Sequence, residues 1–215
     1  MESPLCPPDD PGFRLIETFR WEPGRGVIRR DRHLSRLMGS ARHLGIAPVG
    51  VEEALGGISG PQPLRVRLSV DRAGRAGVTT APFTPLADGA VWRVGIAEQR
   101  LDSTDPWLRH KTTHRQLYDD ARANMPDGAD ELIFLNERGE LCEGTITNLF
   151  TKAGRGFLTP ALSSGLLPGV LREEMLCSGG CVQSVLTTES LQAADAVYVG
   201  NSLRGLIRAE LLLRL

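Results

Sequence analysis

The sequence predicts an α+β fold built from two subdomains. Short apolar runs, some with strict apolar–polar alternation, recur between turn residues and predict antiparallel strands joined by hairpins. Few segments carry helical periodicity, and the sequence contains no internal repeat. The Pro-containing stretch at 82–88 interrupts the pattern and predicts a linker, which gives a small subdomain at 1–86 and a larger one at 87–215.

The small subdomain is expected to combine four strands with two helices after a Pro- and Asp-rich lead-in. Asp31 is predicted to cap a helix that runs to about Leu44, and Gly45 is predicted to end it. A second helix is expected at 51–55. Strands are expected at 13–21, 27–29, 64–70 and 77–80.

The large subdomain is expected to hold more strands than helices. A turn at 136–139 joins two of these strands, and Pro168 and Gly169 open a helix that ends near Leu176. The helix at 112–123 is expected to turn Leu117, Tyr118 and Ala121 inward. Strands are expected at 91–96, 131–135, 141–150, 182–186 and 196–200, and a further helix at 188–193.

Composition excludes several classes of protein. The chain has 25 basic and 26 acidic residues, and this balance argues against nucleic acid or an anionic membrane as the main partner. Apolar residues make up 41% and charged residues 24%, as in globular proteins, and no apolar run approaches a membrane span. The N-terminus lacks the pattern of a signal peptide, so a cytoplasmic protein is expected. Four cysteines without zinc spacing are expected to be reduced thiols in or near the core: Cys6, Cys142, Cys177 and Cys181.

The chain has only two lysines, Lys111 and Lys152, among its 25 basic residues. A deprotonated lysine can attack a carbonyl carbon, whereas arginine cannot. Lys152 is predicted in a hairpin turn, where solvation explains it. Lys111 precedes a helix start, and the count alone leaves a structural and a catalytic role equally open. His110 and His114 have a spacing that could bind a metal, but no carboxylate joins them, so no metal site is predicted.

Two further features accompany Lys111. The segment 165–171 places Pro168 and Gly169 before a helix, which leaves amides free to bind a phosphate, although many helices start this way. Glu143 lies within an apolar strand, where it either faces solvent or meets a cation or a donor. An amine, a phosphate cradle and a carboxylate are the groups that pyridoxal 5'-phosphate requires.

At these residues the sequence resembles the fold-type IV pyridoxal phosphate enzymes, which have the D-amino acid aminotransferase-like fold. This family includes branched-chain aminotransferases, D-amino acid aminotransferases and aminodeoxychorismate lyases. The resemblance runs from about Phe13 to Arg208 and keeps the family order. Its segments are FRLIETFR (13–20), DRHLSRL (31–37), RHKTTHR (109–115), NERGELCEGTITNLF (136–150), GLLPGVLRE (165–173) and GNSLRG (200–205).

The resemblance implies a role for each matching residue. Lys111 would hold the cofactor and move the substrate proton, Arg36 would bind the phosphate, and Glu143 would face the pyridine nitrogen. Leu167 would lie on the ring face, and further phosphate contacts would come from the amides of Val170 and Leu171 and from Asn201 and Ser202. Arg204 and Thr18 are candidates for substrate contacts, with surface solvation equally open. The opening segment with a D-R-G turn is missing, so the small subdomain is expected to be shortened, which puts part of the dimer contact in doubt.

Within the family, the match is closest to the aminodeoxychorismate lyases. That implies release of pyruvate and para-aminobenzoate from 4-amino-4-deoxychorismate, a step of folate biosynthesis. The alternatives are an aminotransferase acting on branched-chain or D-amino acids, and a catalytically inactive relative. Relatives often carry threonine at Leu171 and asparagine at His114. A homodimer that binds a small, amino acid-like substrate is expected.

Overall fold

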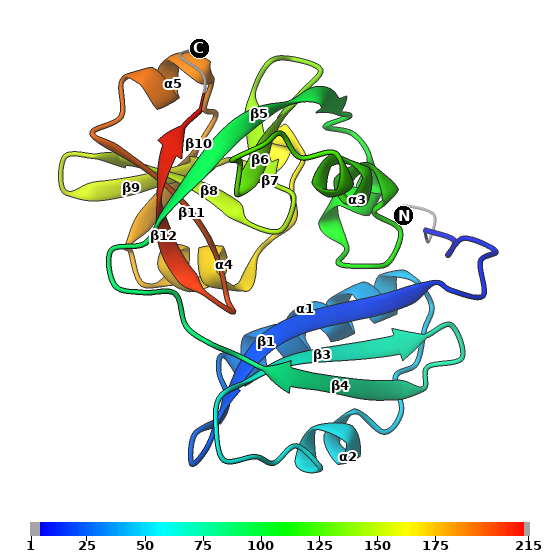
Figure 1. Cartoon of the computed structure of the whole chain (residues 1–215). Helices are drawn as coiled ribbons and strands as arrows, with labels where there is room; N and C mark the ends of the chain where they lie inside the picture. Colours follow the sequence, from blue (N-terminus) through cyan, green and yellow to red (C-terminus); the bar gives the residue numbers. More distant parts are fainter. Residues whose placement is uncertain (1–4, 213–215) are drawn as a thin grey trace. The chain divides into compact units, whose positions relative to one another are not determined.

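The computed structural model describes residues 5–212, which form two compact units (Figure 1). The first unit runs to Pro85 and also contains the segment His110–Arg115. The second unit comprises Leu86–Arg109 and continues from Gln116. Part of the lead-in expected at 1–12 lies outside the described residues, and residues 5–12 form no helix or strand. The segment that contains Lys111 therefore belongs to the first unit, although it is flanked in sequence by the second.

The first unit is an antiparallel sheet with the strand order β2-β1-β3-β4. Alternation in the sequence decides its two faces, because Val66 and Leu68 are fully buried while Arg65 and Arg67 are exposed. The buried face packs with apolar residues of α1 and α2, such as Leu37 and Leu55. The elements are β1 (Arg14–Glu22), β2 (Gly26–Val27), α1 (Arg30–His43), α2 (Val51–Gly56), β3 (Leu64–Asp71) and β4 (Ala76–Pro82).

The start of α1 differs from the prediction. Arg29 adopts a left-handed conformation with φ 57° at the N-cap, so the helix begins at Arg30. Asp31 was expected to cap it but lies exposed in the first turn, where its charge still suits the helix dipole. The end of the helix agrees with the prediction, since Gly45 follows with φ 66°.

The second unit is an eight-stranded mixed sheet with the order β10-β9-β8-β11-β12-β5-β6-β7. One further pairing, of Glu143 in β7 with Asn148 in β8, closes the run from β8 to β7 into a ring of strands. The strands are β5 (Val91–Leu101), β6 (Glu131–Asn136), β7 (Leu141–Gly144), β8 (Asn148–Ala153), β9 (Gly156–Pro160), β10 (Cys181–Ser184), β11 (Ala196–Asn201) and β12 (Gly205–Leu211). The helices are α3 (Gln116–Ala123), α4 (Val170–Cys177) and α5 (Thr188–Gln192), with short 3-10 turns at Pro106–Arg109 and Leu162–Ser164.

Three predictions for this part of the chain were wrong in detail, and two strands were missed. The helix expected from Thr112 begins at Gln116, because Thr112 forms a β-bridge with Leu15. The strand expected at 141–150 is broken between β7 and β8 by a turn. Strands β9 and β12 were not predicted, and Lys152 lies in β8 rather than in the turn that follows it.

The buried side chains agree with the expected inner face of α3, since Leu117, Tyr118 and Ala121 pack against Phe134 and its neighbours. All four cysteines are free; Cys142 and Cys181 are buried, whereas Cys6 and Cys177 are exposed. Within the described residues, no helix is long and apolar enough to cross a membrane.

Candidate functional site

The predicted site residues divide between the two units. Thr18, Arg36 and Lys111 belong to the first unit, where all three lie on or beside β1. The second unit holds the remainder, on β7, at the start of α4 and at the end of β11. These are Glu143, Leu167, Val170, Leu171, Asn201, Ser202 and Arg204.

Lys111 lies in an extended segment that runs along the free edge of β1. The amide of Ile16 donates to the carbonyl of Lys111 at 2.9 Å, and the amide of Thr113 donates to the carbonyl of Arg14 at 2.9 Å. Leu15 and Thr112 face each other in an antiparallel bridge, so Lys111 stands opposite Ile16. Backbone bonds on both sides therefore fix the position of the lysine.

The faces of this segment follow from its neighbours. Thr112 is 2% exposed, and the Nδ1 atom of His110 lies 3.0 Å from the hydroxyl of Ser40 on α1. His110 and Thr112 thus face the helices, and alternation places Lys111 on the opposite face, which also carries Thr18. Lys111 and Thr18 share one face of the first unit.

The two histidines beside Lys111 differ in burial. Burial, together with the nearby ring of His43, lowers the pKa of His110, and the two ring centroids lie 4.9 Å apart. His114 is exposed. No group of metal-binding side chains is found among residues 5–212.

Arg36 is held by a buried carboxylate that the sequence analysis missed. Glu17 is 1% exposed and accepts hydrogen bonds from Nε and Nη2 of Arg36 at 2.8 and 2.6 Å. The Nδ1 atom of His33, also 1% exposed, lies 2.6 Å from Oε2 of Glu17. This network fixes the orientation of the guanidinium group.

The electrostatics of the network follow from burial and pairing. Burial acts to raise the pKa of Glu17, but the charge of Arg36 and hydrogen bonds from His33 and Arg36 outweigh it and lower the pKa to about 2. Burial lowers the pKa of His33, against the opposing effect of Glu17. Glu17 and Arg36 therefore form an ion pair, and the lowered pKa of His33 favours its neutral form. The sequence signal for Glu17 was a carboxylate inside the apolar run from Leu15 to Phe19. The same kind of signal pointed to Glu143.

In the second unit, Glu143 is 6% exposed and oriented by three neutral donors. The hydroxyl of Tyr118 donates to Oε1 at 2.8 Å, and the amide of Leu167 donates to the same oxygen at 3.1 Å. The side-chain amide of Asn148 reaches Oε2 at 3.4 Å. Glu143 therefore does not face solvent, and Tyr118 and Asn148 join the site although the sequence analysis did not assign them to it.

The turn between β7 and β8 determines where Glu143 lies. Buried Glu131 accepts bonds from the amide of Thr145 at 3.0 Å and the hydroxyl of Thr147 at 2.9 Å. Gly144 leaves no room for a side chain, because a Cβ there would lie 2.4 Å from Oγ1 of Thr147 and 2.8 Å from the carboxyl carbon of Glu131. The glycine and the buried carboxylate together explain the EGTIT stretch of the sequence.

The segment before α4 forms a cradle of backbone groups. Gly169 is the N-cap and has no side chain, so the amides of Val170 and Leu171 receive no side-chain cap. A Cβ at Gly169 would lie 1.7 Å from Oδ1 of Asn148, so only glycine permits this approach. Asn148 also donates to the carbonyl of Leu167 at 3.1 Å and thereby connects this segment to Glu143.

The end of β11 lies against the start of α4. A Cβ at Gly200 would be 3.0 Å from Leu171. Asn201 donates to the carbonyl of Ile146 at 3.2 Å and accepts from the amide of Arg204 at 2.9 Å, and Ser202 is 7% exposed. The guanidinium of Arg204 lies 5.7 Å from the centroid of the Trp92 ring, which is a cation–π contact.

These residues fit pyridoxal 5'-phosphate. Uncapped amides at the start of α4, beside glycines that admit no Cβ, suit a phosphate group. An oriented buried carboxylate suits a protonated ring nitrogen. The first unit holds the other two predicted groups, a lysine fixed by backbone bonds and an arginine fixed by a carboxylate. The donor set is therefore that of a pyridoxal phosphate protein.

Comparison with known proteins gives one family. The family model described as amino-transferase class IV matches residues 14–211. A Schizosaccharomyces pombe protein, named provisionally as an aminodeoxychorismate lyase, is 26% identical over 85% of this chain and 83% of its own length. The aminodeoxychorismate lyase of Bacillus subtilis is 32% identical over 47% of this chain and 34% of its own length.

Solved structures agree with this family. A Mesorhizobium loti chain, named provisionally as an amino-acid aminotransferase, is 47% identical with a TM-score of 0.88, over 93% of this chain and all of that one. The 4-amino-4-deoxychorismate lyase of Pseudomonas aeruginosa has a TM-score of 0.79 at 22% identity, over 93% of this chain and 83% of that one. At 22% identity, the similarity to the Pseudomonas aeruginosa structure supports the fold alone.

Proposed function

Because this chain belongs to the class IV aminotransferase family, whose members depend on pyridoxal phosphate, we propose that it is a 4-amino-4-deoxychorismate lyase. The observation that carries the cofactor chemistry is Glu143, a buried carboxylate oriented by Tyr118 and Leu167. The choice of the lyase is supported by the similar proteins of three organisms that are named as aminodeoxychorismate lyases. The products are pyruvate and para-aminobenzoate.

The proposal gives each residue a task on the cofactor, which supplies an electron sink for the carbanion that forms on the substrate. Glu143 would hold the proton on the pyridine nitrogen. Arg36, already oriented by Glu17, would bind the phosphate, and so would the amides of Val170 and Leu171. The side chain of Leu167 would contact the ring, and Asn201 and Ser202 would support the phosphate.

Lys111 carries the proton in this proposal. Its Nζ atom takes the proton from the carbon that bears the substrate amine. The carbon–oxygen bond to the pyruvyl group then breaks, with its electron pair leaving on oxygen, and that group gains a proton to become pyruvate. The atoms of the two products sum to those of the substrate, so the reaction needs no second substrate.

An aminotransferase is the second candidate, because the Mesorhizobium loti chain carries that name at 47% identity and a Thermotoga maritima relative is named as a branched-chain-amino-acid aminotransferase. Lys111 and Glu143 would serve that reaction equally, with branched-chain or D-amino acids as substrates. A 2-oxo acid acceptor is then required, which separates the two reactions. We further propose a cytoplasmic homodimer with subdomains at 1–86 and 87–215, apart from the segment His110–Arg115, which joins the smaller one.

The test is to incubate the protein with 4-amino-4-deoxychorismate and pyridoxal phosphate, without any 2-oxo acid, and to measure both products. Equal amounts of pyruvate and para-aminobenzoate are expected. A yellow protein that forms neither product but transfers an amino group to a 2-oxo acid would establish the aminotransferase instead. A colourless protein that takes up no cofactor would leave only an inactive relative.

The two lysines give a matched control. Lys111→Ala is expected to abolish turnover and the cofactor absorbance, whereas Lys152→Ala is expected to retain both, since Lys152 lies at the end of β8. Borohydride reduction followed by peptide mapping should place the pyridoxyl group on Lys111. Turnover by Lys111→Ala, or labelling of Lys152, would overturn the assignment.

A further inference from the structure

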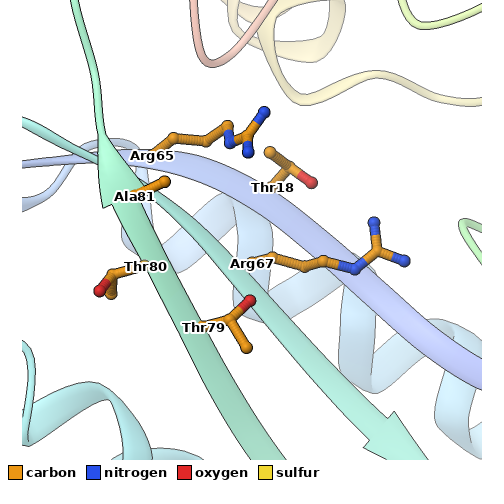
Figure 2. A pocket seen from close by; sticks show the side chains of 6 residues that line it. All are labelled: Thr18, Arg65, Arg67, Thr79, Thr80 and Ala81. Carbon is orange, nitrogen blue, oxygen red and sulfur yellow. The ribbon is translucent and has the colours of Figure 1, made fainter.

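The face of the first unit that carries Thr18 contains a hollow of about 230 Å³. Figure 2 shows its side chains above the strands, with a helix behind the sheet. Three neighbouring strands contribute the lining, β1, β3 and β4. The lining residues are Thr18, Arg65, Arg67, Thr79, Thr80 and Ala81.

Strand register aligns three polar lining residues across the sheet. Arg67 stands directly between Thr18 of β1 and Thr79 of β4, and Arg65 lies two residues along β3 on the same face. In Figure 2 the Arg65 and Arg67 side chains extend on the same side of the sheet as Thr18. The guanidinium groups of both arginines therefore line one small space together with the hydroxyl groups of Thr18 and Thr79.

The arginines are available to a ligand. Both are exposed, and neither Arg65 nor Arg67 forms an ion pair with any residue in the described range 5–212. Two like charges that share a hollow without a carboxylate repel each other and favour a bound anion. A guanidinium binds a carboxylate through two parallel hydrogen bonds, and threonine hydroxyls add further donors.

Lys111 lies on this face at a distance that suits one small molecule. It stands opposite Ile16, whose partner on β3 is Ser69, so Arg67 is two strands across and two residues along from Lys111. Spacings of about 4.8 Å between strands and about 3.4 Å per residue place the two Cα atoms on the order of 12 Å apart. Both long side chains can reach toward the space between them.

We propose that Thr18, Arg65, Arg67 and Thr79 form a subsite for a substrate carboxylate remote from the amine that reacts at Lys111. This proposal rests on the proposed function and defines its substrate class. Pyruvate and para-aminobenzoate each carry a carboxylate, so a substrate that yields both carries two. The hollow is smaller than the roughly 300 Å³ at which whole-ligand pockets begin, which suits one end of such a molecule.

The test uses para-aminobenzoate as the probe and para-aminobenzamide as its uncharged counterpart, with binding to the holoenzyme measured by calorimetry. Arg67→Gln is expected to weaken para-aminobenzoate binding about tenfold and to leave the amide unchanged. Arg67→Lys is expected to restore part of the affinity because it keeps the charge. Arg42→Gln, an exposed arginine on α1, is the matched control and should bind both probes like the parent.

The outcomes separate this subsite from the proposed function. Unmeasurable binding of para-aminobenzoate to the parent, or equal binding by parent and Arg67→Gln, would overturn the subsite. In the lyase assay, Arg67→Gln should raise KM about tenfold with little change in kcat. Lyase activity with an unchanged KM would refute the subsite and keep the function, whereas probe binding that depends on Arg67 without lyase activity would refute the function and keep the subsite.

Discussion

Two buried carboxylates, one in each unit, are held in different ways. Glu17 in β1 is paired with the guanidinium of Arg36 and contacts His33, so its charge is compensated. Glu143 in β7 accepts hydrogen bonds from a phenol and two amides, all of them neutral. Each residue interrupts an apolar run, and sequence alone does not distinguish them.

The difference assigns them different tasks. A carboxylate paired with a cation stabilises the fold and fixes its partner, and breaking such a pair is costly because one buried charge remains. The hydrogen bonds that orient Glu143 come from neutral groups, and an amide oxygen can accept them in place of the carboxylate. We therefore expect substitutions at Glu17 to act first on stability and substitutions at Glu143 to act first on catalysis.

The largest effect is expected for Glu17→Gln. This change removes the charge opposite Arg36 while keeping the shape, and it should lower the free energy of unfolding by about 3–5 kcal/mol. Urea denaturation of the parent and the variant measures this difference. Glu143→Gln in the same assay should lose less than about 1 kcal/mol, because an amide oxygen still accepts from Tyr118 and Leu167. Equal losses at both positions would remove the contrast.

Acid should reveal the same pairing without a mutation. The pKa of Glu17 is about 2 in the folded protein against its ordinary value of 4.5, so its contribution is present above pH 4.5 and lost as the pH falls toward 2. This difference corresponds to about 3 kcal/mol. The lowered pKa of His33 acts in the same direction below its ordinary value of 6.5, because the unfolded state then binds the proton. Stability measured from pH 7 to pH 3 should fall less steeply in Glu17→Gln; identical curves would contradict the pairing.

Glu143→Gln sharpens the comparison from the catalytic side. An amide cannot hold a proton on the pyridine nitrogen, so kcat should fall about a hundredfold, or about 2.7 kcal/mol in activation free energy. Initial rates at saturating cofactor measure this, and absorbance titration should show a smaller effect on cofactor binding. A variant with the rate of the parent would refute the role of Glu143.

The smallest effect is expected for Tyr118→Phe. The hydroxyl that donates to Glu143 is lost, but the edge-to-face contact with Phe134 remains, so kcat should fall about fivefold, or about 1 kcal/mol. Tyr198→Phe alters the only other tyrosine in the sequence, which contacts Phe157, and serves as the control. Equal effects of the two changes would show that Tyr118 acts only through packing.

The sequence was most informative where a residue's neighbours along the chain decide its surroundings. Alternation in β3 and the inner face of α3 were predicted because a period of two or of 3.6 depends on local order alone. Lys111 and Glu143 were predicted because the cofactor requires an amine and a carboxylate and because their segments resemble those of the family. Their roles remain predictions.

Contacts between distant segments could not be predicted. Tyr118 and Glu143 are 25 residues apart, and Arg36 and Glu17 are 19 apart, so no periodicity connects them. The bridge of Thr112 to Leu15 ends the expected helix early for the same reason. The hollow beside Arg67 depends on the register of three strands, which alternation within one strand does not determine.

The bonds of the Lys111 segment to β1 have a consequence for biosynthesis. Translation delivers all four strands of the first sheet before this segment leaves the ribosome, so part of the β1 edge stays unpaired until residue 113 has emerged. Unpaired edges invite pairing with other chains, which makes a nascent chain stalled after Pro85 prone to aggregate. The same backbone bonds that pair this edge also fix the position of Lys111. The candidate nucleophile is therefore positioned only once the edge of β1 is no longer open to other chains.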